Sequence, residues 1–354
     1  MPLAALKRLG SSFLTPRSQS PSQATKESLF PPIPADEECN HDCNGCPISD
    51  SGSGYGKAFD KIGINTTDAL GGQVKPYSTH VIVATGKTDW IRDVEDIEGS
   101  VMEALAGKRA AVENGKVMIS ASNLPLPHEH FAQEEKGAPT DVILLPAFTV
   151  LEGVTPGDAD EIVRSYINRG PTNNTPLPST EEPSTKDTTS TATTTTTITT
   201  AAAAITSETP SATTTTTIAL TTTTTIPTTL KSHPYPHAFL ILICSHRHRD
   251  ARCGISAPIL SREFEKHLRA ALLWRDHSDR RPGGASVVFI NHVGGHKYSA
   301  NVIIYRKEDG QGIWLARVAP KHVEGIVRHT IVEGKVNSEM LRGGFNRRTG
   351  ATSW

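Results

Sequence analysis

Residues 238–253 have the sequence AFLILICSHRHRDARC. The first seven form an unbroken apolar run that ends in Cys244, which is typical of a strand buried on both faces in the middle of a sheet. A helix is predicted to follow over 258–273, with Pro258 in the first turn, where its missing N–H costs no hydrogen bond. Large apolar residues recur at every fourth position of that helix: Leu260, Phe264, Leu268 and Leu272.

The rest of the C-terminal half alternates further strands with a last helix. Strands are predicted over 286–291, 301–305 and 313–318, and the helix follows Pro320. One strand, one helix, two or three strands and a final helix is a thioredoxin-like order. We therefore expect an α/β sandwich.

The N-terminal half has the same rhythm. Strands are predicted over 80–84, 116–120 and 141–145, and a helix over 158–167. One more helix is indicated by an apolar stripe at helical spacing: Val94, Ile97, Val101 and Leu105. The fold class that we expect is thus α/β, with two thioredoxin-like halves.

A low-complexity segment separates the two halves. Residues 170–232 are mostly Thr, Ser, Pro and Ala, with almost no large apolar side chains to form a core. We interpret them as a disordered linker rather than an O-glycosylated stalk, because no signal peptide precedes them. The expected organisation is a disordered tail (1–35), an N-terminal half with a Cys cluster (36–169), this linker, a C-terminal ferredoxin domain (233–333) and a C-terminal tail (334–354).

The overall composition excludes several classes of protein. A formal net charge of −1 gives no sign of nucleic-acid or anionic-membrane binding, and no apolar run approaches the roughly 18 residues of a membrane span. We expect a soluble protein. The first thirty residues are basic, like a weak mitochondrial transit peptide or a disordered tail. Five clustered cysteines indicate metal chemistry in a reducing compartment rather than a secreted disulfide scaffold.

Two pairs of potential metal ligands follow predicted strands in the C-terminal half. Cys244 and Cys253 flank one loop, and His292 and His296 flank a double glycine that permits a tight turn. Two sulfurs and two nitrogens suit a zinc ion or an iron–sulfur cluster. The wide Cys–Cys spacing counts against structural zinc, where two to four intervening residues are usual.

Charged residues crowd the cysteine loop. Arg249, Asp250 and Arg252 are candidates for a supporting shell, in which the arginines offset the charge of a cluster or contact an acidic redox partner. His246 forms a Cys-x-His step with Cys244, but no second such step follows Cys253. His246 is therefore a weaker ligand candidate.

A second cysteine group lies near the N-terminus. Cys39, Cys43 and Cys46 have the spacing of a radical-SAM motif, but they precede any predicted strand. With His41 they could bind zinc or a second cluster, or they could act as reactive thiols. The second alternative would make the protein a thiol oxidoreductase.

The motif Cys244-Ser-His-x-x-Arg-Asp-x-Arg-Cys253-Gly, followed by Asn291-His-Val-Gly-Gly-His-Lys297 and Ala300-Asn301-Val302, resembles the sucrase/ferredoxin-like family of thioredoxin-like [2Fe–2S] proteins. Residues 85–93 also resemble the N-terminal region of that family. The resemblance implies a [2Fe–2S] cluster, with Cys244 and Cys253 on one iron and His292 and His296 on the other. It implies a one-electron carrier with proton-coupled chemistry, rather than an enzyme with its own substrate. The alternative is a structural zinc protein.

The sequence ends in Trp354 after a basic, Gly-rich stretch. This residue resembles the C-terminal tryptophan signal by which client proteins dock on the cytosolic iron–sulfur assembly targeting complex. That resemblance favours a cytoplasmic protein over a mitochondrial one. The electron donor and acceptor are not identified by any motif.

Overall fold

The structure is a computed structural model that describes residues 29–34, 55–126, 137–177 and 229–354. The two described halves belong to one compact unit. The N-terminal cysteines Cys39, Cys43 and Cys46, and most of the predicted linker, lie outside the described residues.

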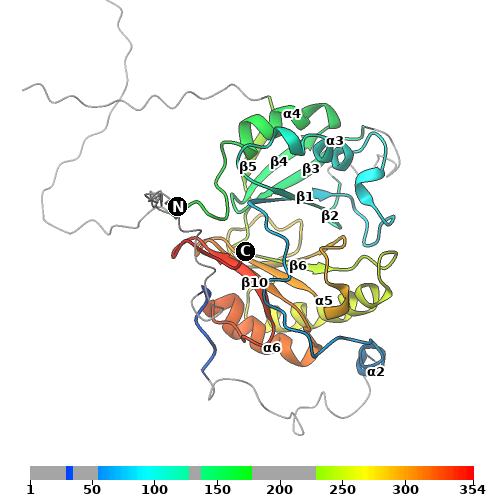
Figure 1. The fold of residues 1–354 in the computed structure, drawn as a ribbon, viewed down its shortest axis with the longest axis vertical. Helices are drawn as coiled ribbons and strands as arrows, with labels where there is room; N and C mark the ends of the chain where they lie inside the picture. Colours follow the sequence, from blue (N-terminus) through cyan, green and yellow to red (C-terminus); the bar gives the residue numbers. More distant parts are fainter. Residues whose placement is uncertain (1–28, 35–54, 127–136, 178–228) are drawn as a thin grey trace, which may run out of the picture. The chain divides into compact units, whose positions relative to one another are not determined.

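Eleven strands form one mixed sheet, in the order β11-β10-β9-β8-β6-β7-β2-β1-β3-β4-β5 (Figure 1). The strands of the first half are β1 (Thr79–Ala84), β2 (Val117–Ser122), β3 (Thr140–Leu145), β4 (Thr149–Val154) and β5 (Lys231–Pro234). Those of the second half are β6 (Phe239–Cys244), β7 (Ala285–Ile290), β8 (Val302–Arg306), β9 (Gln311–Leu315), β10 (Leu341–Asn346) and β11 (Ala351–Thr352). The predicted strands and the mixed α/β class are confirmed.

Helices connect the strands in both halves. The first half contains α3 (Val101–Gly107) and α4 (Ala159–Glu161), which continues as a π-helix, η4 (Ile162–Ile167). The second half contains α5 (Ala251–Ala270) and α6 (Val323–Gly325), which continues as a π-helix, η7 (Ile326–Glu333). Before the first half lies α2 (Tyr55–Asp60), and single 3₁₀ turns are η1 (Val94–Asp96), η2 (Arg109–Ala111), η3 (Pro156–Asp158), η5 (His296–Tyr298) and η6 (Pro320–His322).

The two halves repeat one topology. In each, the first two strands are parallel (β1 with β2, β6 with β7). The third strand is antiparallel to the first, and the fourth and fifth extend the sheet on that side, each antiparallel to the strand before it. The last helices also match in sequence, as Val154-x-Pro156 and Ile162-Val-Arg correspond to Val318-x-Pro320 and Ile326-Val-Arg. Because β5 is the last strand of the first repeat, the predicted linker interrupts that repeat instead of separating two finished halves.

A reciprocal pair of asparagines joins the repeats where β2 meets β7. The Asn123 side chain accepts the Phe289 N–H (2.7 Å), and the Asn291 side chain accepts the Ala121 N–H (3.1 Å). Their backbone N–H groups donate to the same two residues. Each asparagine thus extends the sheet where the ladder has only the Ser122–Ile290 pair.

Apolar side chains fill both faces of the sheet. One face packs against helices in two separate clusters, around α5 and α6 in the second half and around α3 and α4 in the first. Side chains on the other face form one cluster shared by both halves, which includes Ile82, Leu242 and Trp314. This shared cluster explains why the halves form a single unit.

Helix α5 begins seven residues before the predicted start. Asp250 caps it by accepting the Arg252 N–H, so the helix includes Cys253, and Pro258 lies inside it, where it removes one backbone hydrogen bond. The stripe from Val94 to Leu105 is two short helices, and Ile97 is partly exposed.

The tails and linker edges also differ from the prediction. Residues 334–354 contain β10, whose side chains are buried, and β11. Leu29 and Phe30, within the expected N-terminal tail, are buried in the core of the second half because they are large and apolar. Asn173, at the start of the expected linker, is fully buried.

Candidate metal centre

The two predicted cysteines meet at one end of the sheet in the second half. Cys244 is the last residue of β6, and Cys253 lies in the first turn of α5. Both thiols are buried and free. The Cys244 and Cys253 sulfurs and one His292 ring nitrogen lie within 4.8 Å of one another, which brings three of the four predicted ligands together.

The two histidines face each other across the predicted turn. Nδ1 of His296 lies 3.5 Å from Nε2 of His292, and the ring centroids are 5.2 Å apart. Gly294 and Gly295 have φ angles of 83° and 70°, a left-handed conformation that favours glycine. His296 is outside the group of three and has a side chain that is 45% exposed. The fourth candidate therefore lies at the solvent edge of the site.

The two thiols are electrostatically unequal. A hydrogen bond from Cys253 lowers the pKa of Cys244, and the same bond, together with burial, raises the pKa of Cys253. Cys244 is thus the first of the pair to become a thiolate, which is the form that binds metals.

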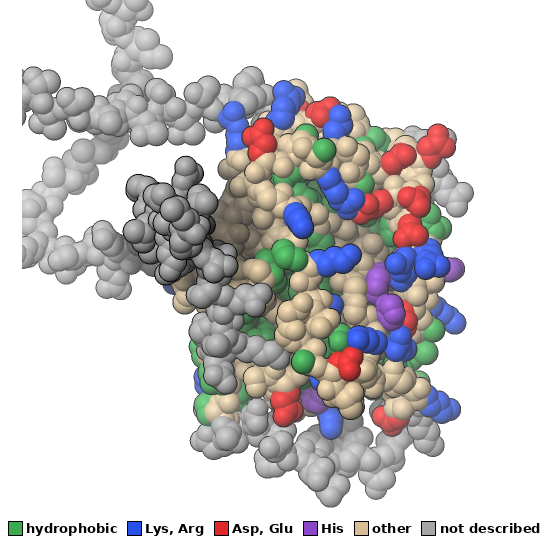
Figure 2. All heavy atoms as spheres, viewed as in Figure 1, with side chains coloured by type: hydrophobic (Ala, Val, Ile, Leu, Met, Phe, Trp, Pro, Cys, Tyr) green, Lys and Arg blue, Asp and Glu red, His purple; other side chains and the backbone are tan. Residues whose placement is uncertain are grey.

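The predicted supporting residues form ion pairs around the site. Arg252 binds Asp250 at 2.8 Å and lowers the pKa of that carboxyl group, and Arg249 reaches Asp93 of the first half at 2.8 Å. Asp250 also lies 3.9 Å from Nε2 of His296. Figure 2 shows histidine side chains exposed among Lys and Arg on the face that it views.

His246 supports the site from outside the ligand group. Its buried ring has Nε2 at 2.9 Å from the Trp90 carbonyl, and its Nδ1 accepts the backbone N–H of His292 at 3.2 Å. These partners fix the tautomer with hydrogen on Nε2. Both ring nitrogens are used, so His246 holds His292 in place and is not available as a ligand, in line with its weaker ranking.

A loop of the first half contacts the cysteine loop. The Ser245 hydroxyl donates to the Thr88 carbonyl (2.7 Å), and Asp89 pairs with His248 (2.7 Å). This is the segment 85–93 in which the family resemblance was noted. The first half therefore helps to shape a site whose candidate ligands all come from the second.

Arg342 was not predicted to belong to the site, and Asn301 was part of the family motif without a predicted role. The Arg342 guanidinium, assigned above to a basic tail, is buried and donates to the Gly294 carbonyl and the Asn301 side chain, both at 3.0 Å. Asn301 also donates to the Gly295 carbonyl (3.0 Å). A sequence signal existed, because Leu341 and Phe345 flank Arg342 with apolar residues.

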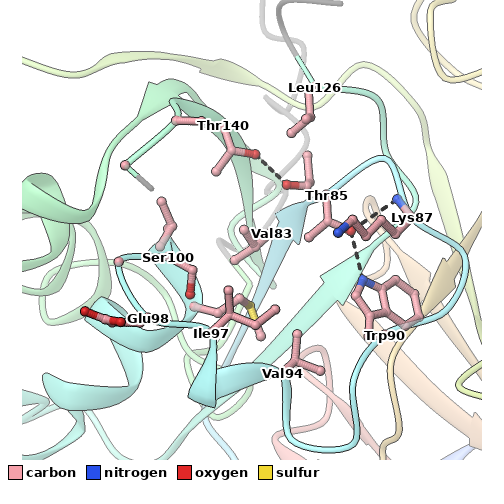
Figure 3. Close-up of a pocket in the computed structure, with 16 residues that line it drawn as sticks. Val83, Thr85, Lys87, Trp90, Val94, Ile97, Glu98, Ser100, Leu126 and Thr140 are labelled. Carbon is pink, nitrogen blue, oxygen red and sulfur yellow. Dashed lines mark hydrogen bonds between the residues drawn. The ribbon is translucent and has the colours of Figure 1, made fainter. Parts of the chain in front are cut away.

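The corresponding end of the first half holds a cavity of about 130 Å³ instead of metal ligands (Figure 3). Ala84 and Leu124 stand where the second half has Cys244 and His292. The Trp90 indole N–H, at the edge of the cavity, already donates to the Thr85 hydroxyl at 2.9 Å. Neither Ala84 nor Leu124 offers a thiol or an imidazole, and the sulfur that lines this cavity is the thioether of Met102.

Trp354 does not project freely. Its ring stacks on Tyr77 with centroids 5.0 Å apart and meets the edge of Phe345 at 6.3 Å. Within the described residues, no helix is long and apolar enough to cross a membrane.

Comparisons with known proteins agree with the resemblance noted above. The sequence model of a family described as Sucrase/ferredoxin-like matches residues 70–343. Actin patches distal protein 1 of Saccharomyces cerevisiae is 51% identical over 92 residues, which are 26% of this chain and 29% of that protein. Altered inheritance of mitochondria protein 32 of Clavispora lusitaniae is 44% identical over 107 residues, 30% of this chain and 35% of that protein. The chain therefore matches about a third of the length of these relatives, and no solved structure matches.

Proposed function

Since the chain belongs to the Sucrase/ferredoxin-like family, we propose that it is an electron-transfer protein with a [2Fe–2S] cluster held by Cys244, Cys253, His292 and His296. The convergence of both thiols and the His292 ring within 4.8 Å carries this proposal. As in the family resemblance, the cysteines would hold one iron and the histidines the other. When bound, such a cluster supplies one-electron chemistry at a potential raised by its neutral histidine ligands.

The residues of the site suit that role in different ways. The buried cysteines keep water from the sulfur side, whereas His296 reaches solvent. Burial lowers the pKa of His296, and the Asp250 carboxylate opposes that effect. His296 is therefore the side chain that would take up a proton on Nε2 as an electron arrives, with Asp250 stabilising the imidazolium.

Anaerobic purification with iron and sulfide analysis tests this function, together with electron paramagnetic resonance of the reduced protein. We expect two irons and two sulfides per chain, a red-brown colour and a midpoint potential that decreases as the pH is raised from 6 to 10. A colourless protein that contains zinc would overturn the proposal. It would support the second candidate, a structural zinc site, which the same Cys2His2 donor set also suits.

Three finer inferences accompany this proposal. Each half is thioredoxin-like, as its strand order and its covered sheet face suggest. The protein acts in the cytoplasm and receives its cluster through Trp354. Because one relative is named for mitochondrial inheritance, fractionation of cells is the test of this location. Its electron donor and acceptor are other redox proteins.

A further inference from the structure

Arg342 is a buried cation whose hydrogen-bond partners are all neutral. Its side chain lies in β10 and the residue is 3% exposed. Nη1 donates to the Gly294 carbonyl and to the Asn301 side chain, and Nη2 donates to the Gln73 carbonyl at 2.8 Å. Among the described residues, Nε has no hydrogen-bond acceptor.

The surroundings of the guanidinium are aromatic rather than acidic. It lies 5.5 Å from the ring centroid of Trp314 and 5.9 Å from that of Tyr298, where cation–π attraction returns part of the lost hydration. Burial lowers the pKa of Arg342, and nearby Tyr298 and Cys244 oppose that effect. A buried charge without a counter-charge is costly, so a neighbouring anion would stabilise it. A Cys244 thiolate would be such an anion.

Arg342 also contacts the turn between the two candidate histidine ligands. A side chain at Gly295 would begin 2.5 Å from Nη2, so the guanidinium packs directly against this glycine. Asn301 ties the arrangement to the first cysteine, because its carbonyl accepts the Cys244 N–H at 3.3 Å and its side chain accepts from Arg342. The cation therefore contacts the histidine turn directly and is linked to Cys244 through Asn301.

We propose that Arg342 is a positioning residue whose buried charge offsets the negative charge that reduction adds to the metal centre, and so raises its reduction potential. The inference rests on the proposed function. It assigns the tuning of that site to a residue outside the ligand set and outside the motif of the family resemblance.

Three substitutions test this role in the full chain after cluster loading. Arg342→Gln removes the charge and should lower the equilibrium constant for reduction by about tenfold or more. Tenfold corresponds to a fall of about 59 mV in the midpoint potential of a one-electron couple. Arg342→Lys keeps the charge and should stay close to wild type. Arg342→Met, which is uncharged and fills a similar volume, replaces the Gln variant if that variant does not fold.

Arg306 provides a matched control. It is 6% exposed and donates to the Ile331 and Val332 carbonyls, but it pairs with Asp309 instead of contacting the histidine turn. Arg306→Gln should destabilise the fold and leave the potential unchanged. A loaded Arg342→Gln or Arg342→Met protein with the wild-type potential overturns this inference alone. Wild-type protein that binds no iron overturns the proposed function and this inference with it.

Discussion

The two repeats of the sheet have the same topology but differ in what they hold at the end of the first strand. In the second repeat, Cys244 is the last residue of β6 and His292 directly follows Asn291. Both belong to the group of side chains that could hold a metal ion. In the first repeat, Ala84 and Leu124 occupy those positions. The loop that contains Thr88 contacts the cysteine loop of the second repeat. One copy of the fold presents the candidate ligands and the other supports them.

Replacing Cys244 with alanine, the residue that the first repeat has at the equivalent position Ala84, should have the largest effect on metal content. Cys244→Ala removes one of the two sulfurs that converge with the His292 ring, and we expect loss of essentially all cluster iron and visible absorption. Iron analysis after anaerobic purification measures this. The triple variant Cys39→Ser/Cys43→Ser/Cys46→Ser should keep its iron. The opposite pattern would assign the metal to the N-terminal cysteines.

Exchanging a nitrogen ligand for sulfur sharpens the comparison between the two ligand pairs. His296→Cys adds a thiolate and removes the exposed imidazole, so the midpoint potential should fall by about 100 mV or more and lose its dependence on pH. Potentiometric titration between pH 6 and pH 10 measures both. A retained slope would show that another group takes up the proton.

The shared core gives the next largest effect. Burial lowers the pKa of His80 to about 3, between the Tyr305 hydroxyl (2.8 Å) and the Ser120 hydroxyl (2.8 Å). Below about pH 6.5 the unfolded chain therefore binds a proton that the folded chain does not, and stability falls towards pH 3 by up to about 1.4 kcal/mol per pH unit.

His80→Leu gives β1 the residue that β6 has at Leu240. We expect it to cost about 1–3 kcal/mol at pH 7, because buried hydroxyls lose a partner, and to flatten the acid slope. Urea denaturation at a series of pH values measures both effects. An unchanged slope would mean that other groups dominate the acid sensitivity.

The two asparagines that join β2 to β7 allow a symmetric test. Asn123→Ala and Asn291→Ala each leave one buried backbone N–H without its acceptor, so each should cost about 1–3 kcal/mol in unfolding free energy. Only Asn291→Ala should also speed the loss of visible colour, because Asn291 immediately precedes His292. Equal colour loss in the two variants would mean that the whole sheet, rather than this one strand end, controls the site.

The smallest expected effect separates the two hydrogen bonds of His246. Asparagine can keep the acceptor for the His292 N–H, and glutamine can keep the donor to the Trp90 carbonyl. We expect His246→Asn to release iron to a chelator more slowly than His246→Gln, by about two- to tenfold, the value of one hydrogen bond. The reverse order would make the contact with the first half the more important one.

Several features of this fold could be predicted from the sequence. Apolar runs such as the one ending in Cys244 are strong strand signals, and the cysteine and histidine pairs at strand ends predicted a candidate site in which three of the four side chains come together. Other features depend on distant partners. Asn123 looks like an ordinary loop residue and Asn291 like the end of a strand, and only the pairing of β2 with β7 makes the two side chains complementary.

Basic and Gly-rich composition concealed β10, since Gly343 and Gly344 favour a tail or loop. The structure gives those glycines a packing role. A side chain at Gly344 would clash with the Gly312 carbonyl and meet Phe30 at 2.9 Å. Arg342 was missed together with β10, and its role could not be predicted because its acceptors come from three separate segments.

Trp90 and Trp314 flank the candidate metal centre from the two repeats. The indole of Trp90 meets His246 edge-on at 5.8 Å, and Trp314 lies against the Arg342 guanidinium. A coloured metal centre beside these two tryptophans would quench their fluorescence. The chain therefore contains its own optical reporters, and a dimmed intrinsic fluorescence would follow loading in real time without an attached dye.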